Sequence, residues 1–140
     1  MYVPEHFAAD DPDALIARVA RRWAGLLVTV EADGTPAATH LPIVWDVKNK
    51  VVRGHIARVN PQWRGGASRG LIVLRGPEAY VSPNWYPSKA EHGKAVPTWN
   101  YEAVDLFAKL DRELWEQCHH NPVAMLGRIS QERLERAAHD

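Results

Sequence analysis

The first hundred residues alternate short apolar runs with turn signals. The apolar runs are Leu26–Val30, Ala37–Trp45, Val51–Ala57 and Leu71–Leu74. Asp-Gly, Lys-Asn and Gly-Pro pairs separate or end these runs. Short strands that are punctuated every ~8–12 residues are typical of an antiparallel barrel or sandwich. The pattern therefore predicts a β-rich domain.

One amphipathic helix is expected before the first strand. Asp11 is a suitable N-cap, and Pro12 fits the first helical position. The apolar positions that share one helical face are Leu15, Ile16, Val19, Ala20 and Trp23. Gly25 would end the helix.

The periodicity changes near Asn100–Val104. From there, apolar residues recur at helical spacing at Val104, Leu106, Phe107, Leu110, Leu114 and Trp115. Asp111 could cap one helix, and Ser130 another after a short apolar turn at Val123–Leu126. The sequence thus predicts a β-rich part over residues 1–101 and an all-α tail over residues 102–140.

The connection Ser82–Lys94 has an unusual composition. It lies between two expected strands, Ala79–Val81 and Ala95–Trp99, and it is rich in hydroxyl, amide, ammonium and indole groups. Such a connection can offer donors to an anion and flat faces to a ring. A rigid aromatic loop that plugs a barrel end would have the same composition, so both interpretations stay open.

Charge and composition exclude several classes of protein. Seventeen basic residues balance 17 acidic ones, which gives no global electrostatic reason for nucleic-acid or membrane binding. The single Cys118 allows no internal disulfide and suits a reducing compartment. No apolar run approaches the ~20 residues of a membrane span, and the N-terminus lacks the features of a signal peptide. We therefore expect a cytoplasmic protein.

A few polar residues could carry chemistry. His40 and His55 lack a second ligand at metal-binding spacing, so no metal site is expected. Arg58 follows a strand directly and could grip a phosphate through its planar fork. Ser82 and Lys89 could add donors, and charge-assisted bonds of this kind contribute ~1.5–3 kcal/mol each. Solvated surface residues are the alternative, because Arg and Lys are mostly exposed.

Several motifs together resemble the PaiB family of FMN-binding negative transcriptional regulators. They are residues 1–7 (MYVPEHF), 39–42 (THLP), 54–63 (GHIARVNPQW), 76–89 (GPEAYVSPNWYPSK) and 93–101 (GKAVPTWNY). The resemblance implies a split β-barrel, a homodimer with FMN at the subunit interface, and a role in repression that involves DNA.

The same resemblance implies a cofactor site. Arg58, Asn60, Ser82 and Lys89 become candidates for the FMN phosphate and ribityl chain. Trp85, Tyr86 or Trp99 would then lie near the isoalloxazine ring. His40 and Thr98 lie in the matched motifs and complete the predicted cofactor-binding set. No catalytic residue is predicted.

The remainder of the chain departs from this family, whose members are longer and continue through further strands and helices. Residues 103–116 (AVDLFAKLDRELWE), 120–123 (HNPV) and 126–134 (LGRISQERL) instead resemble the N-terminal helical region of bacterial α-glucan (glycogen) phosphorylases. We therefore expect an α+β protein, in which a truncated FMN-binding split β-barrel is followed by a short all-α C-terminal tail. A barrel without its last strands would have an unpaired edge unless something covers it.

Three functions follow from these readings. The first is an FMN-binding transcriptional regulator of the PaiB kind, without catalytic activity. The second is a flavin-dependent oxidoreductase, since split-barrel flavoproteins include such enzymes. The third is an inactive fusion that carries a phosphorylase segment, and phosphorolysis itself is not expected because nothing resembles that catalytic domain.

Overall fold

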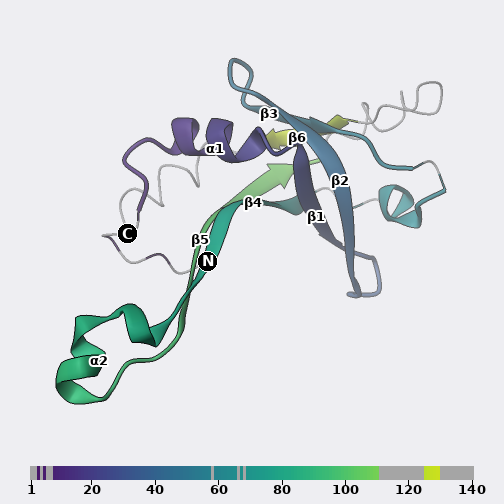
Figure 1. The fold of residues 1–140 in the computed structure, drawn as a ribbon. Coiled ribbons are helices and arrows are strands. Elements are labelled where there is room, and N and C mark those ends of the chain that lie inside the picture. The colour runs from purple at the N-terminus through teal and green to yellow at the C-terminus, as the bar shows by residue number, and fades with distance from the viewer. Residues whose placement is uncertain are drawn as a thin grey trace.

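The computed structural model describes residues 3, 5, 8–57, 59–65, 67, 69–110 and 125–129 of the 140. Its elements are α1 (Pro12–Ala20), β1 (Ala24–Val30), β2 (Pro36–Asp46), β3 (Val51–Gly54), η2 (Pro61–Arg64), β4 (Arg69–Val81), η3 (Pro83–Trp85), α2 (Pro87–His92), β5 (Thr98–Lys109) and β6 (Met125–Ile129). The strands pair antiparallel in the order β1-β2-β3-β6-β5-β4, and β4 returns to β1 to close a barrel (Figure 1). The described chain is therefore a split-barrel-like β fold with few helices.

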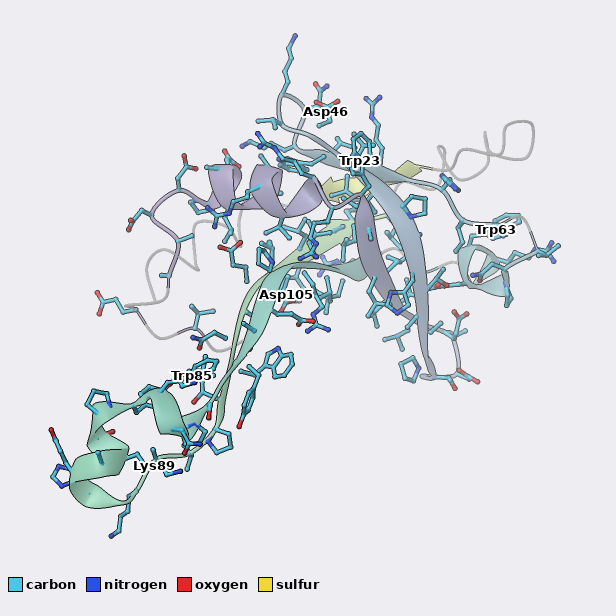
Figure 2. The ribbon with its side chains drawn as sticks, viewed as in Figure 1. Trp23, Asp46, Trp63, Trp85, Lys89 and Asp105 are labelled. Atoms are coloured by element: carbon cyan, nitrogen blue, oxygen red, sulfur yellow. The ribbon has the colours of Figure 1, made fainter. Side chains whose placement is uncertain are left out.

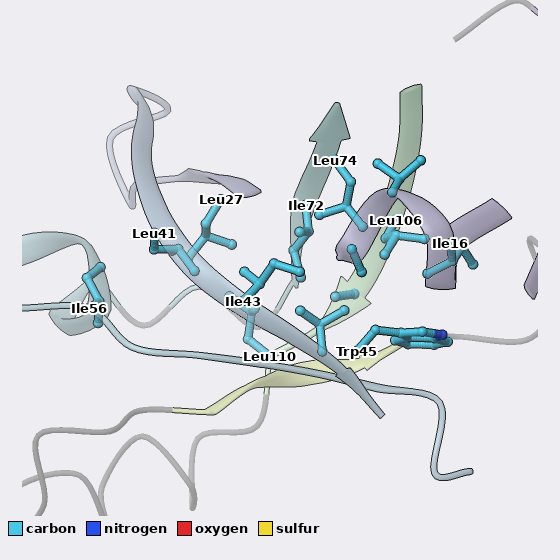
Figure 3. Packing of buried hydrophobic residues seen from close by; sticks show 14 residues of the cluster. Ile16, Leu27, Leu41, Ile43, Trp45, Ile56, Ile72, Leu74, Leu106 and Leu110 are labelled. Carbon is cyan, nitrogen blue, oxygen red and sulfur yellow. The ribbon is translucent and has the colours of Figure 1, made fainter. Parts of the chain in front are cut away.

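Helix α1 forms as its sequence predicts and covers the apolar core. The Asp11 side chain accepts a hydrogen bond from the Ala14 backbone N–H at 3.0 Å, and Pro12 opens the helix. Ile16 and Val19 are each 1% exposed and pack among the inward side chains of the strands (Figure 3). Burial of such a side chain stabilises the fold by roughly 1.5–3 kcal/mol.

The barrel interior is filled from alternate positions of the strands, because successive side chains of a strand point to opposite faces. The buried members of the core are Ile16, Val19, Ala20, Leu27, Leu41, Ile43, Trp45, Val52, Ile56, Ile72, Leu74, Leu106, Ala108 and Leu110. The indole N–H of Trp45 has no hydrogen-bond partner within the described part of the chain. Among the described residues, the buried polar side chains are those of Thr29 and Gln62.

Strands β4 and β5 extend beyond the barrel as a two-stranded arm. Their ladder runs from Arg69 opposite Lys109 to Val81 opposite Thr98. Residues 82–97, with η3 and α2, form the tip, which projects away from the barrel (Figure 1). No residue of η3 or α2 is buried, so the proposal that this connection plugs a barrel end is wrong for the single chain.

A bulge at the base of the arm separates it from the barrel. The register of β4 and β5 shifts between Arg75 and Glu78. A Cβ atom placed on Gly76 would lie 2.8 Å from Cβ of Glu102 and 3.3 Å from Cγ2 of Val19. Glycine is therefore required here by the close approach of β5 and α1 to the β4 backbone.

Gln62 fixes the loop that follows β3 to strands β1 and β2. Its side-chain Nε2 lies 3.0 Å from Thr29 Oγ1, 3.1 Å from the Ala37 carbonyl oxygen and 3.3 Å from the Leu27 carbonyl oxygen. The Thr39 hydroxyl donates to Gln62 Oε1. Gln62 is only 4% exposed, so its hydrogen bonds are made where no water can replace them.

The four strands expected before residue 75 are confirmed, except that the third, expected over Val51–Ala57, ends at Gly54. The all-α tail is wrong wherever the structure describes it. Residues 98–109 form β5, and residues 125–129 form β6. The helical spacing of the apolar residues led to a wrong prediction, because the alternation of a strand fits residues 104–110 equally well. Val104, Leu106, Ala108 and Leu110 point inward, and the ladder with β4 selects this pattern.

The predicted unpaired edge is also corrected, because β6 pairs with both β3 and β5. The helices expected from Asp111 and Ser130 lie outside the described residues. Among the helices that the structure describes, none has the length and apolar character needed to cross a membrane.

Gly76→Ala should lower the free energy of unfolding by about 1–3 kcal/mol, because the new methyl group meets Cβ of Glu102, which cannot move without its backbone. Gly65→Ala is the matched control, since its methyl group would meet only the flexible carboxylate end of Glu31. Urea unfolding of both variants tests this. Equal losses would show that the base of the arm tolerates separation of β4 from β5.

Gln62→Leu should cost about 2–4 kcal/mol, because the Thr29 and Thr39 hydroxyl groups and two carbonyl oxygens would lose a buried partner. Thr29→Val removes one of these contacts and should cost about 1 kcal/mol. Chemical denaturation measures both variants. If Gln62→Leu lowered the free energy of unfolding no more than Thr29→Val does, the hydrogen bonds of Gln62 would not stabilise the fold as a group.

Candidate functional site

Six of the predicted cofactor-binding residues lie together on the arm. They are Ser82, Trp85, Tyr86, Lys89, Thr98 and Trp99. Thr98 begins β5 opposite Val81, and Ser82 follows β4 directly, so the two ends of the tip are held by the last rung of the ladder. The arm therefore brings the predicted donors and the predicted rings into one region.

The tip is organised by local hydrogen bonds among its polar groups. Ser82 Oγ accepts from the Asn84 backbone N–H at 3.3 Å and caps η3. The Lys89 ammonium group donates to Asn84 Oδ1. Gly93 ends α2 with φ of +66°, which glycine adopts without strain. Lys89 is thus tethered near Ser82 through Asn84, and it remains an exposed cation.

Aromatic side chains cover one side of the arm. Tyr80 and Trp99 are cross-strand partners with ring centroids 6.3 Å apart and tilted by 50°. Tyr101 is opposite Glu78, and Trp99 Nε1 donates to Glu78 Oε2 at 3.4 Å. Trp99 is 53% exposed and Trp85 is 70% exposed. These rings offer flat surfaces that the chain itself does not cover.

The other predicted residues belong to the barrel. His40 is exposed on β2 opposite Leu26. Asn60 caps η2: its Oδ1 accepts from the Gln62 backbone N–H, and its Nδ2 donates to Thr39 Oγ1, each at 2.9 Å. Arg58 lies outside the described residues. In this structure the Asn60 amide is therefore occupied in holding its own loop.

One chain does not bring the two groups together. Trp63, in the η2 segment next to Asn60, lies on one side of the barrel, and Trp85 and Lys89 lie at the far end of the arm on the other side (Figure 2). The single cluster of Asn60, Ser82 and Lys89 that the sequence suggested is accordingly not formed within one subunit.

An exposed apolar face on the outside of the barrel was missed by the sequence reasoning. Leu26 lies opposite His40 on β2 and Val73 on β4, and Val28 lies opposite Ala38 and Leu71. The apolar side chains of Leu26, Val28, Leu71 and Val73 are half-buried, and the exposed members of the face are Val30 at 59%, Val44 at 47% and Phe107 at 41%. We call this set, with His40, the outer face. It spans β2, β1, β4 and β5.

The outer face continues into the aromatic side of the arm. Along β5, the positions of the same side are Trp99, Tyr101, Ala103, Asp105 and Phe107, so one carboxylate, opposite Val73, lies between the apolar end and the aromatic end of this side. On β4, the bulge shifts the register so that Glu78 and Tyr80 come to lie opposite Tyr101 and Trp99. His40 and Trp99 therefore belong to one side of a continuous sheet, although they are far apart on it.

A signal for this face was present in the sequence. The runs Leu26-Leu27-Val28 and Leu71-Ile72-Val73-Leu74 are apolar at every position. An antiparallel strand with one solvated face would alternate apolar and polar residues, whereas a continuous run is typical of a strand covered on both faces. The outward residues of β1 and β4 therefore predict a second covered surface besides the core.

The two carboxyl groups whose pKa values depart from the ordinary range, those of Asp33 and Asp46, lie outside this region. Hydrogen bonds from the backbone and side chain of Thr35 lower the pKa of Asp33 in the β1–β2 turn. Hydrogen bonds from the side chain and backbone of Asn49 lower the pKa of Asp46 in the β2–β3 turn. Both carboxylates stabilise turns on the surface.

FMN, which the sequence resemblance implies, suits the chemistry of the exposed groups. Its phosphate requires cations and hydroxyl or amide donors, which Lys89 and Ser82 supply. Its flat ring system requires apolar or aromatic contacts, which Trp85 and Trp99 on the arm and the outer face of the barrel supply. The residues present therefore fit the cofactor, although they lie in two separate regions of the chain.

Comparison with known proteins supports this assignment. A family described as "Putative FMN-binding domain" matches residues 1–133. The Bacillus subtilis protein named "Protease synthase and sporulation protein PAI 2" is 37% identical over 113 residues, which cover 78% of this chain and 52% of that protein. An uncharacterized Saccharomyces cerevisiae protein, YKL070W, is 26% identical over 129 residues, or 76% of each chain. The chain thus spans about half the length of its Bacillus relative.

A second similarity concerns a shorter part of the chain. Glycogen phosphorylase of Mycobacterium tuberculosis is 49% identical over 43 residues, which make up 31% of this chain and 5% of that enzyme. Both resemblances inferred from the motifs are therefore confirmed. Because the family match extends over nearly the whole sequence, the chain belongs to the FMN-binding domain family of the PaiB kind, and its cofactor is FMN.

Proposed function

We propose that this protein is an FMN-binding regulator that works as a homodimer, with each cofactor held between the barrel of one subunit and the arm of the other. The observation that carries the proposal is the separation of the predicted site residues. His40 and the Asn60 loop lie on the barrel, and Ser82, Lys89 and Trp99 lie on the arm. A two-fold dimer would supply both groups to each of two sites.

The outer face gives such a dimer a surface. Val30, Val44 and Phe107 are exposed apolar side chains on β1, β2 and β5, and half-buried Leu26, Val28, Leu71 and Val73 lie on the same outward side of β1 and β4. Exposed apolar patches of this kind mark interaction sites. The arm needs a partner for the same reason. An isolated two-stranded hairpin is at best marginally stable in water, and this one exposes Tyr80, Trp85 and Trp99. Pairing with a second copy would cover both surfaces at once.

We assign the roles by side-chain chemistry. Lys89, Ser82 and Arg58 would hold the phosphate, Thr98 would contact the ribityl chain, and Trp85, Tyr86 or Trp99 would stack near the ring. His40 would meet the cofactor from the barrel side. We assign Asn60 to positioning, because both ends of its amide already bind the chain at 2.9 Å.

The regulatory role rests on the family and on the kind of groups present. The described part of the site offers the Lys89 ammonium group, hydroxyl groups and the exposed rings of Trp85 and Trp99, which suit a flavin. We therefore propose that FMN controls the association of this protein with DNA. The alternative function is a flavin-dependent oxidoreductase.

Subunit complementation tests the shared site. Lys89→Ala and His40→Ala should each weaken FMN binding by about 10- to 100-fold through loss of polar contacts. When the two variants are co-expressed with different tags and the heterodimer is purified, one site per dimer has an intact barrel and an intact arm. Fluorescence titration should then show about half of the sites with normal affinity.

The controls separate two kinds of failure. Lys94→Ala removes a cation of the same connection without an assigned role, and it should leave affinity unchanged. A wild-type protein that takes up no FMN, as judged from its visible spectrum, would refute FMN binding. A wild type that binds FMN, with a heterodimer that has no normal site, would refute only the shared arrangement.

Two assays distinguish regulation from catalysis. In steady state with NADH or NADPH, the FMN-loaded protein should consume the donor no faster than free FMN at equal concentration. In selection from a random DNA library at low salt, the loaded protein should retain DNA, and FMN removal should change the retained fraction. Rapid donor turnover without DNA retention would favour the oxidoreductase.

A further inference from the structure

We propose that residues 21–23 (RRW), in the turn between α1 and β1, form a surface that contacts the backbone of DNA. The inference rests on the DNA-binding function proposed above, and it names the part of the chain that carries this function. Three observations support it: the backbone conformation of Trp23, the exposure of its indole, and the two arginines that precede it.

Trp23 adopts a backbone conformation that bulky residues rarely take. Its φ is +59°, in the left-handed region, where a Cβ atom is crowded and glycine is the usual residue. Both ends of the residue are held in place: the Trp23 N–H donates to the Ala20 carbonyl oxygen at 3.0 Å, and the Ile43 N–H donates to the Trp23 carbonyl oxygen at 3.1 Å. The path from α1 into β1 therefore requires this conformation, although the nearest glycine is Gly25.

The indole of Trp23 gains little within the chain in return for this strain. It lies at the end of α1 (Figure 2), is 64% exposed, and has no hydrogen bond or ring contact with a described residue. Lys50 is the other described non-glycine residue with positive φ, and its ammonium group binds Asp13. Strained residues cluster at functional sites, so the contact that Trp23 makes is expected outside its own chain.

Two arginines beside Trp23 give this end of α1 an excess of positive charge. Arg21 and Arg22 are exposed, and neither forms an ion pair with a described residue. The helix dipole favours cations at the C-terminal end of a helix, but it gives no reason for an exposed indole next to them. Cations and a ring together are typical of a surface that binds nucleic acid.

Arg22 also faces a hollow in which the carboxylates are already bound. The hollow has a volume of about 470 Å3 and is lined by residues of α1 and β4 that include Arg18, Arg22 and Glu78. Glu78 pairs with Arg75, and Arg18 pairs with Glu102 at 2.8 Å. The guanidinium group of Arg22 is therefore the cation of this hollow that an added phosphate would meet.

DNA fits this surface better than a lipid membrane does. Guanidinium groups bind phosphates through planar pairs of N–H donors, and an exposed ring packs against sugars and bases. The acidic residues Asp11 and Asp13 lie at the opposite end of α1, so DNA would approach the end that carries Trp23. Membrane affinity scales with the apolar area buried, whereas here one ring stands beside two cations.

Two variants of the full chain test this surface with a fluorescein-labelled DNA duplex of random sequence. Arg21→Ala combined with Arg22→Ala should weaken binding by about 10- to 100-fold at low salt and should lower the slope of log Kd against log salt by about 2, because two phosphate contacts are lost. Trp23→Gly should weaken binding by about tenfold with an unchanged slope, because the ring carries no charge. Glycine adopts this φ without strain, so the variant should fold. Fluorescence anisotropy at several salt concentrations measures both effects.

Arg69→Ala is the control, because Arg69 is an exposed arginine that begins β4 near the opposite end of β1. It should leave the affinity and the slope close to those of the wild type. A wild type that binds no DNA would refute the proposed DNA-binding function together with this inference. DNA binding that neither variant changes, or that Arg69→Ala changes as much, would refute only this surface.

Two further results would assign Trp23 to another partner and would also overturn the inference. Loss of the dimer in Trp23→Gly, measured by light scattering, would show that a second copy of the chain covers the indole. Loss of binding to phosphatidylserine vesicles in Trp23→Gly, with DNA binding retained, would show that the surface contacts lipid.

Discussion

The long ladder between β4 and β5 is the interaction on which the rest of this structure depends. Between Arg69 and Arg75, β4 and its partner β5 form a wall of the barrel, and between Glu78 and Val81 they form the arm. The bulge at Gly76 separates the part of the β4–β5 pair that belongs to the barrel from the part that forms the arm. The same backbone pairing therefore fixes the core, the outer face and the distance from the barrel at which the donors of the tip are presented.

Local signals in the sequence predict the elements whose structure is decided locally. The Asp11-Pro12 cap, the Asp-Gly turn and the short turn after Asn60 form as expected, because side-chain caps and glycine conformations act within a few residues. The segment from Val104 to Leu110 was misassigned because its apolar residues satisfy both helical and strand periodicity. Only pairing with β4, which is distant in the sequence, decides between them.

For the candidate site, too, the chemistry of the residues could be predicted from the sequence, whereas their relative positions depend on pairing between distant parts of the chain. The chemistry of Ser82, Lys89 and Trp99 could be predicted from residue types and motifs, and the structure gathers these residues on the arm. The separation of these residues from His40 and Asn60 could not be predicted from the sequence, because it depends on how far the ladder between β4 and β5 extends beyond the barrel. The role of Asn60 in holding its loop depends on Thr39 of β2, which comes into reach because the η2 loop lies against β2.

The outer face explains why an incomplete site is compatible with a stable chain. A strand such as β1, apolar at Leu26, Leu27 and Val28, gains from burial on both sides, yet the core uses only the side of Leu27. The unused side becomes a surface whose burial favours association, and the exposed rings of Tyr80 and Trp99 extend it along the arm. In the proposed dimer, the apolar residues that would drive association lie on the barrel strands, and the polar residues assigned to the cofactor lie on β2 and at the tip that joins β4 to β5, so dimer formation and completion of the site would be a single event.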